Sequence, residues 1–82
     1  MDVPERPWTA ASLAVSALRV AASGDETFAS HYATLAAYMD QQAPCAGGEL
    51  FRTLSRHHTI RALAKRSEAA VLAHSNGLPW ED

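Results

Sequence analysis

The chain has 82 residues, which is enough for one domain, and a chain of this size buries only about 60% of the surface that it exposes when unfolded. Hydrophobic residues make up 48% of it, but only 7% are aromatic and much of the remainder is alanine, a composition that favours thin, closely packed helices. The formal net charge of −2 argues against a general nucleic-acid coat or a cationic membrane binder, and the single cysteine excludes an internal disulfide framework.

The stretch from Trp8 to Ser23 is apolar around most of a helical cylinder. Its polar residues share one narrow stripe, and they are Ser12, Ser16, Arg19 and Ser23. Residues 1–8 contain two prolines and three charged side chains and predict an extended arm, after which Thr9 is suited to cap a helix. We therefore expect a helix over residues 9–23 that is central to the fold, because so much apolar surface must be covered by other helices or by another chain.

A second helix is predicted over residues 25–42. Gly24 is suited to end the first helix and Asp25 to cap the second, with Glu26 favoured near the positive end of the helix dipole. Large apolar residues at helical spacing predict the core face of this helix, and they are Phe28, Tyr32, Leu35 and Met39. Alanines beside this stripe predict close packing against the first helix.

The principal break in the chain is predicted at residues 43–48. Pro44 disfavours a helical conformation for the residue before it, and the paired glycines Gly47 and Gly48 add backbone freedom. A third helix is expected over residues 49–57.

A fourth helix is predicted over residues 59–75. The apolar pattern falters from Ser55 to His58, so either Thr59 caps a separate helix or one helix continues through a polar turn, and we prefer a short break. The side of this helix expected to face the core carries Ile60, Leu63, Ala64, Ser67, Ala70 and Val71. Asn76 and Gly77 end the helix, and residues 76–82 form a tail.

These elements predict a single all-α domain over residues 1–82, built as a small bundle of three to four helices with the first helix at its centre. Because the first helix is apolar around nearly its whole girth in so short a chain, we also expect a homodimer. The side chains expected to anchor the dimer or another interaction are Trp8, Leu13, Leu18 and Trp80.

No set of residues with catalytic or metal-binding spacing is found in the sequence. Cys45 has no neighbouring cysteine or histidine, and the adjacent His57 and His58 would point about 100° apart on a helix. We therefore predict no catalytic residues, no metal and no cofactor.

Basic residues are concentrated in one segment. Five of the seven lie between Leu50 and Ser67, where there is no acidic residue: Arg52, Arg56, Arg61, Lys65 and Arg66. Such a segment predicts a surface that binds an acidic protein partner or, as the alternative, nucleic acid. Residues 59–67 resemble the first helix of a repressor-type helix-turn-helix, but the tight turn and second helix of that motif do not follow.

The sequence therefore favours a small non-enzymatic protein-interaction module, such as a bacterial regulator or inhibitor that binds a partner through its helical surface. The alternative is a nucleic-acid-binding regulator that uses the basic segment. No apolar run approaches the length of a membrane span, since Arg19 interrupts the best one, and the acidic residues near the start argue against a signal peptide. Together with the single cysteine, this predicts a cytoplasmic protein that does not bind membranes.

Overall fold

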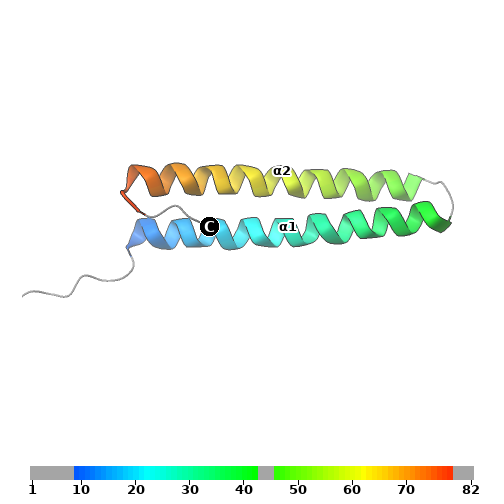
Figure 1. Cartoon of the computed structure of the whole chain (residues 1–82), viewed down its shortest axis with the longest axis horizontal. Coiled ribbons are helices and arrows are strands. Elements are labelled where there is room, and N and C mark those ends of the chain that lie inside the picture. Colours follow the sequence, from blue (N-terminus) through cyan, green and yellow to red (C-terminus); the bar gives the residue numbers. More distant parts are fainter. Residues whose placement is uncertain (1–8, 43–45, 79–82) are drawn as a thin grey trace, which may run out of the picture.

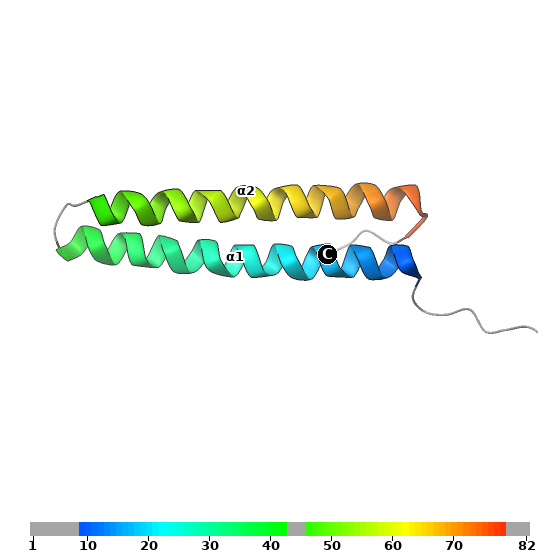
Figure 2. The same ribbon diagram turned by 180° about the vertical axis from the view of Figure 1, so that it is seen from behind.

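Two long helices account for almost all of the residues 9–42 and 46–78 that the computed structural model describes. They are α1 (Ala10–Gln42) and α2 (Ala46–Ser75), and both views show them side by side and running in opposite directions (Figures 1 and 2). The all-α class is confirmed, and no strand occurs in the described residues. The predicted bundle of three to four helices is wrong, because the two predicted pairs of helices are each one continuous helix.

The outer ends of the hairpin are those that the sequence predicts. Thr9 caps α1: its hydroxyl Oγ1 accepts a hydrogen bond from the Ser12 amide at 3.1 Å, and the Ser12 hydroxyl accepts one from the Thr9 amide at 2.6 Å. At the end of α2, Gly77 adopts a left-handed φ of 65°, and the amide of Leu78 donates to the Ala73 carbonyl at 2.8 Å. This is a Schellman cap, which satisfies carbonyl groups that the last turn leaves free.

The line of contact between the two helices, here called the seam, follows a seven-residue repeat. On α1 the residues at one repeat position are all buried, and they are Val15, Ala22, Ala29 and Ala36. On α2 the matching position holds Gly48, Ser55, Ala62 and Ala69, of which only Ser55 is half-buried. A seven-residue repeat keeps the same side of each helix against its partner along the whole length, and small side chains let the backbones approach closely.

The second repeat position of the seam carries larger and more polar side chains. On α1 it holds Leu18, Asp25, Tyr32 and Met39, and on α2 it holds Phe51, His58, Lys65 and Leu72. Of these, Asp25 is buried and the others are half-buried. A seam that contains an aspartate, a histidine and a lysine must satisfy their polar groups internally.

The predicted break at Gly24 and Asp25 is wrong, since α1 passes through both residues without interruption. A glycine inside a helix costs only about 1 kcal/mol relative to alanine, which packing along the seam readily offsets. Asp25 does not cap a helix, because its carboxylate turns into the seam and binds side chains of α2.

The preferred break near His58 is also wrong, and the continuous alternative is the observed one. The polar turn exists because it faces polar partners on α1: the Ser55 hydroxyl donates to the Ala29 carbonyl at 2.7 Å, and His58 contacts Asp25. The Thr59 hydroxyl donates to the Ser55 carbonyl within its own helix at 3.0 Å instead of capping a new one. The last residues of the predicted loop, 46–48, belong to α2 as well.

The expectation that residues 9–23 form a surrounded central helix is wrong. One line of this segment is covered, with Val15 and Ala22 buried, while Leu13 is 53% and Val20 is 73% exposed. The predicted core stripe of residues 25–42 is displaced in the same way, because Ala29 and Ala36 are buried whereas Phe28 and Leu35 are exposed.

The same displacement affects α2. Three residues predicted to face the core are 61–70% exposed, namely Ile60, Leu63 and Val71, and the buried residues are Ala62, Ala69 and Ala73. The hairpin therefore has a thin core: seven hydrophobic residues are buried among those described, and all but Val15 are alanine.

Candidate interaction surface

A buried carboxylate, Asp25, is bound by several side chains of the opposite helix. It is 5% exposed and lies between three basic side chains that α2 presents on successive turns. His58 Nδ1 lies 2.7 Å from Oδ1, Arg61 Nε lies 3.4 Å from the same oxygen, and Lys65 Nζ binds Oδ2. Since a carboxylate only accepts hydrogen bonds, His58 donates to it from a protonated Nδ1.

The charge of Asp25 is stabilised by these partners. Hydrogen bonds from Lys65 and then from His58 hold the pKa of Asp25 well below its ordinary value, and burial acts in the opposite direction. The positive charge of Arg61 adds a smaller effect in the same direction as the hydrogen bonds. An anion held in this way fixes which residues of α1 and α2 face one another, so the cluster acts within the hairpin instead of at an external site.

Further ion pairs line one edge of the hairpin. Arg66 binds Glu26 through two nitrogens, with Nη2 at 2.7 Å and Nε at 3.0 Å from its carboxylate oxygens. Arg52 binds Asp40 across the seam through Nη1 and Glu49 within α2 through Nη2 at 2.8 Å. Hydrogen bonds from these arginines lower the pKa of Glu26 and the pKa of Glu49.

The five basic residues singled out in the sequence do not form one patch. Arg61 and Lys65 contact Asp25, while Arg52 and Arg66 bind carboxylates at the edge of the hairpin. Arg56 is exposed and makes no ion pair with a carboxylate of residues 9–42 or 46–78. Most of the positive charge is therefore neutralised inside the hairpin, which the sequence alone could not reveal because the acidic partners lie on the other helix.

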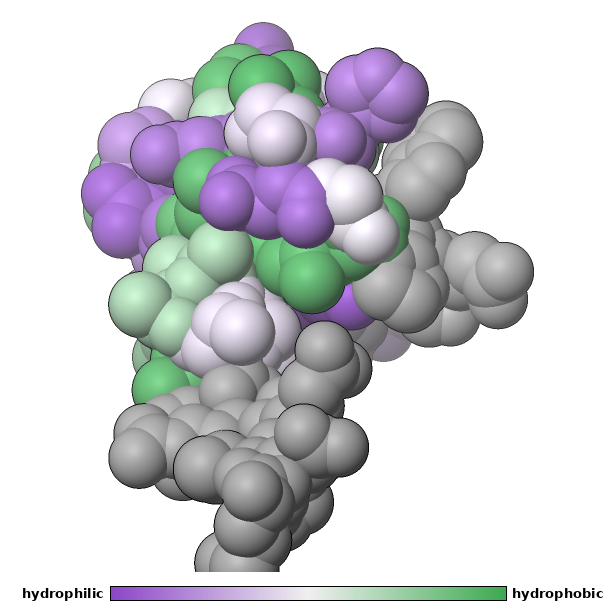
Figure 3. Space-filling view, turned by 90° about the vertical axis from the view of Figure 1, so that its left-hand side faces the viewer, coloured by the Kyte–Doolittle hydropathy of each residue, from purple (hydrophilic) through white to green (hydrophobic). Residues whose placement is uncertain are grey.

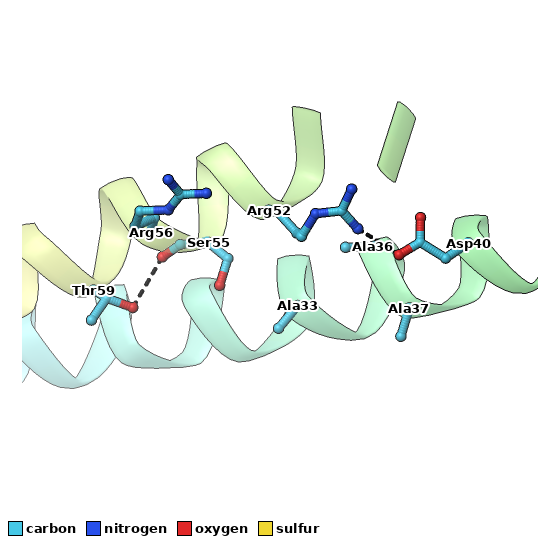
Figure 4. Close-up of a pocket in the computed structure, with 8 residues that line it drawn as sticks. All are labelled: Ala33, Ala36, Ala37, Asp40, Arg52, Ser55, Arg56 and Thr59. Carbon is cyan, nitrogen blue, oxygen red and sulfur yellow. Dashed lines mark hydrogen bonds and ion pairs between the residues drawn. The ribbon is translucent and has the colours of Figure 1, made fainter. Parts of the chain in front are cut away.

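A shallow groove of about 530 Å³ follows the same edge near the loop (Figure 4). From α1 it is lined by Ala33, Ala36, Ala37 and Asp40, and from α2 by Arg52, Ser55, Arg56 and Thr59. The Arg52–Asp40 ion pair closes one end of it, and the Thr59 hydroxyl is used within α2. Its other hydroxyl, that of Ser55, donates to the Ala29 carbonyl.

The two edges of the hairpin differ in chemistry. The seven-residue repeat assigns every residue to one side of the seam or the other. One edge carries serines and the ion pairs and is here called the polar face; it includes Ser16, Ser23, Glu26, Asp40, Arg52 and Arg66. The opposite edge, here called the apolar face, carries Ala14, Ala17, Ala21, Phe28, Leu35 and Tyr38 of α1 and Leu50, Leu54, Ala64 and Val71 of α2, together with the polar residues His31, His57, Arg61 and Glu68. All of these residues are exposed except Leu54, which is half-buried.

All the large apolar residues of the apolar face except Val71 lie toward the loop end of the hairpin. Phe28 is 53% exposed, Leu35 42%, Tyr38 56% and Leu50 57%. Beneath them, rings of the seam are stacked together, with the centroid of Tyr32 5.6 Å from that of His58 and 6.0 Å from that of Phe51. The ring of Phe28 packs against His58 in a tilted arrangement, with the centroids 5.2 Å apart. The seam thus supports a row of apolar side chains that the hairpin does not cover.

The predicted anchor residues have different positions. Leu18 packs beside the small buried cluster of Val15, Ala69 and Ala73, so it stabilises the hairpin itself. Leu13 is exposed on the outer side of α1. Trp8 and Trp80 lie outside the described residues, as does Cys45. At the end of the hairpin where α1 begins and α2 finishes, hydrophobic residues reach the surface beside hydrophilic ones (Figure 3).

Searches for related proteins leave the function to be argued from these residues. No protein-family model, no curated protein and no solved structure matches the chain. Among the described residues, no three histidine, cysteine, aspartate or glutamate side chains are grouped so as to hold a metal ion. Neither α1 nor α2, over the ranges described, has the length and hydropathy needed to cross a membrane.

Proposed function

We propose that the chain is a non-enzymatic protein-interaction module, acting as a small regulator or inhibitor, that binds a protein partner through its apolar face. The observation that carries the proposal is the mismatch between core and surface. The described residues bury seven hydrophobic side chains, six of them alanine, and leave nine large ones between 42% and 73% exposed.

Exposed apolar surface of this kind supports a binding role on physical grounds. Scattered single hydrophobic residues are ordinary on protein surfaces, but a row of them along one face is typical of an interaction site. Phe28, Leu35, Tyr38 and Leu50 form such a row over two helices, and two of the four are aromatic residues of the kind enriched in interfaces. The serines and ion pairs of the opposite face suit contact with water.

The nucleic-acid alternative receives less support. Phosphate binding requires cations that are free to replace condensed counterions, and four of the five basic residues already bind carboxylates of the chain. Arg56 alone would provide little affinity. An acidic protein partner that binds mainly through these cations is disfavoured for the same reason, and we therefore place the partner on the apolar face.

Site-specific photo-cross-linking in cells that express the chain tests the proposal. A photoreactive phenylalanine analogue at Leu35, on the apolar face, is expected to give adducts with protein. The same analogue at Ser30, an exposed residue five positions earlier and on the polar side, is the matched control and is expected to give few. Absence of adducts from Leu35, or equal adducts from both positions, would contradict the proposal.

A further inference from the structure

We infer that the protein partner on the apolar face is a second copy of this chain, stacked with its loop at the opposite end so that the pair forms an antiparallel four-helix bundle. The inference rests on the proposed function and specifies the partner. It draws on the dimensions of the face, on the distribution of large and small residues along it, and on two charged residues within it.

The apolar face has the size of a stable interface. A helix of 30 residues, such as α2, is about 45 Å long. Two neighbouring helices whose axes are 8–10 Å apart present a face roughly 18 Å wide, and the product is about 800 Å². Stable protein interfaces bury about 800 Å² on each partner, so a second two-helix face of equal length would fully cover this one.

The apolar face is divided into a bulky half and a shallow half. Toward the loop it carries Phe28, Leu35, Tyr38, Leu50 and Leu54, whereas the other half carries Ala14, Ala17 and Ala21 of α1 and a single large apolar residue, Val71 of α2. The two copies are related by a two-fold axis that lies between the two apolar faces and is perpendicular to the helices. This axis places α1 of one copy on α1 of the second copy, with the two helices antiparallel. The bulky half of each copy then fills the shallow half of the other, which is the self-complementarity that a two-fold interface requires.

A dimer with both loops at the same end does not satisfy this condition. Its two-fold axis runs parallel to the helices and lays α1 on α2 of the second copy, so Phe28, Leu35 and Tyr38 of each copy meet Leu50 and Leu54 of the other at one end. At the other end, the alanines of α1 face Ala64 and Val71. The crowded end would hold the other end apart, so the interface would be poorly packed.

Two charged residues within the face agree with the antiparallel arrangement. Glu68 is exposed and makes no ion pair with a residue of the described ranges, and Arg61, seven residues earlier on α2, is half-exposed at 51% beside Asp25. An axis that crosses α2 between Arg61 and Glu68 brings each of them toward the opposite charge on α2 of the second copy. The dimer would then hold this ion pair twice, once on each side of the axis.

The mass of the particle in solution is the first test. Size-exclusion chromatography with light scattering is expected to give twice the chain mass of 8.8 kDa for the wild type. Leu35→Glu, on the apolar face, is expected to reduce the dimeric fraction at least tenfold. Ala37→Glu, an exposed position two residues later on the polar side, should remain dimeric. A monomeric wild type, or equal effects of the two variants, would overturn the inference.

The orientation of the two copies relative to one another is tested on a chain whose apolar face carries no substitution. A spin label at Gln41→Cys, an exposed position near the loop, in a Cys45→Ser background, reports the separation of the two loop ends. We expect a distance on the order of 50 Å between labels, from 1.5 Å per residue on each side of the axis. A distance of roughly 20–30 Å would place both loops at one end and overturn the antiparallel arrangement.

The photo-cross-linking experiment separates failure of this inference from failure of the proposed function. Adducts of Leu35 with the same chain support the second copy. A monomeric chain whose Leu35 gives adducts only with a different protein overturns the second copy and leaves the interaction module standing. A monomeric chain without adducts overturns both.

Discussion

Asp25 of α1 and Lys65 of α2 form an ion pair inside the seam, 40 residues apart in the chain, where the aspartate is only 5% exposed. With His58 and Arg61 on the same carboxylate, this pair joins α1 to three side chains of α2. It also divides the seam into a terminal half packed by Val15 and Leu18 and a loop half packed by Tyr32 and Phe51.

Removing the buried carboxylate is expected to destabilise the hairpin strongly. Asp25→Ala leaves the charges of Lys65 and Arg61 without their partner in the seam, and such uncompensated charge is costly. We expect Tm, followed by circular dichroism, to fall by roughly 5 °C or more. Glu26→Ala is the control, since Glu26 is half-exposed and binds Arg66 at the edge, and it should lower Tm by much less. Equal losses for the two variants would show that the seam pair has no special role.

Acid is expected to weaken the hairpin through the same group. The pKa of Asp25 is lower in the folded chain than its ordinary value of 3.8, so the folded state holds this proton less tightly than the unfolded state. The resulting stability is fully present above pH 4 and is lost progressively below it. Urea unfolding from pH 7 to pH 2 should show this loss. Asp25→Asn should unfold with a shallower dependence on pH, and an identical slope would exclude Asp25 as the main source.

The alanines of the seam set the distance between the helices. Ala29 is 8% exposed, and its carbonyl accepts a hydrogen bond from Ser55, so a larger side chain at position 29 must push α2 away. We expect Ala29→Leu to cost about 1–3 kcal/mol of unfolding free energy in urea titration. Ala37→Leu, at an exposed position on the same helix, should change it by less than about 0.5 kcal/mol. A neutral Ala29→Leu would mean that the helices are not closely packed there.

Replacing each of two glycines by alanine is expected to change the stability of the hairpin in opposite directions. A Cβ at Gly24 would meet nothing within 4 Å, and the residue is helical, so Gly24→Ala should stabilise by about 0.5–1 kcal/mol. Gly77 has a φ of 65°, and Gly77→Ala should destabilise by about 1 kcal/mol. Thermal unfolding of both variants checks this pair. A destabilising Gly24→Ala would indicate that α1 is interrupted at Gly24.

The parts of the fold that depend on local chemistry could be predicted from the sequence. Helix-forming composition gives the all-α class, Thr9 caps α1, and Gly77 ends α2 after Ser75. Each of these outcomes depends on residues within one turn of the position concerned, so no knowledge of the opposite helix is needed.

The parts that depend on the opposite helix could not be predicted. Gly24 and Asp25 have the chemistry of a helix end, and only the partners of Asp25 on α2 show why the helix continues. Ser55 and His58 interrupt the apolar pattern because they face polar groups of α1, not because the helix breaks. A search for core residues by size also fails here, since alanine fills the seam and the large side chains of the apolar face lie outside it.

The dependence of Tm on protein concentration tests the central claim most directly, namely that the hairpin is completed by covering its apolar face with a second copy. Folding coupled to dimerisation makes Tm rise with concentration, whereas the Tm of a monomer is constant. We predict a steady rise over a hundredfold range for the wild type and for Ala37→Glu, and a flat, lower Tm for Leu35→Glu. A wild-type Tm that stays constant over that range would contradict the account.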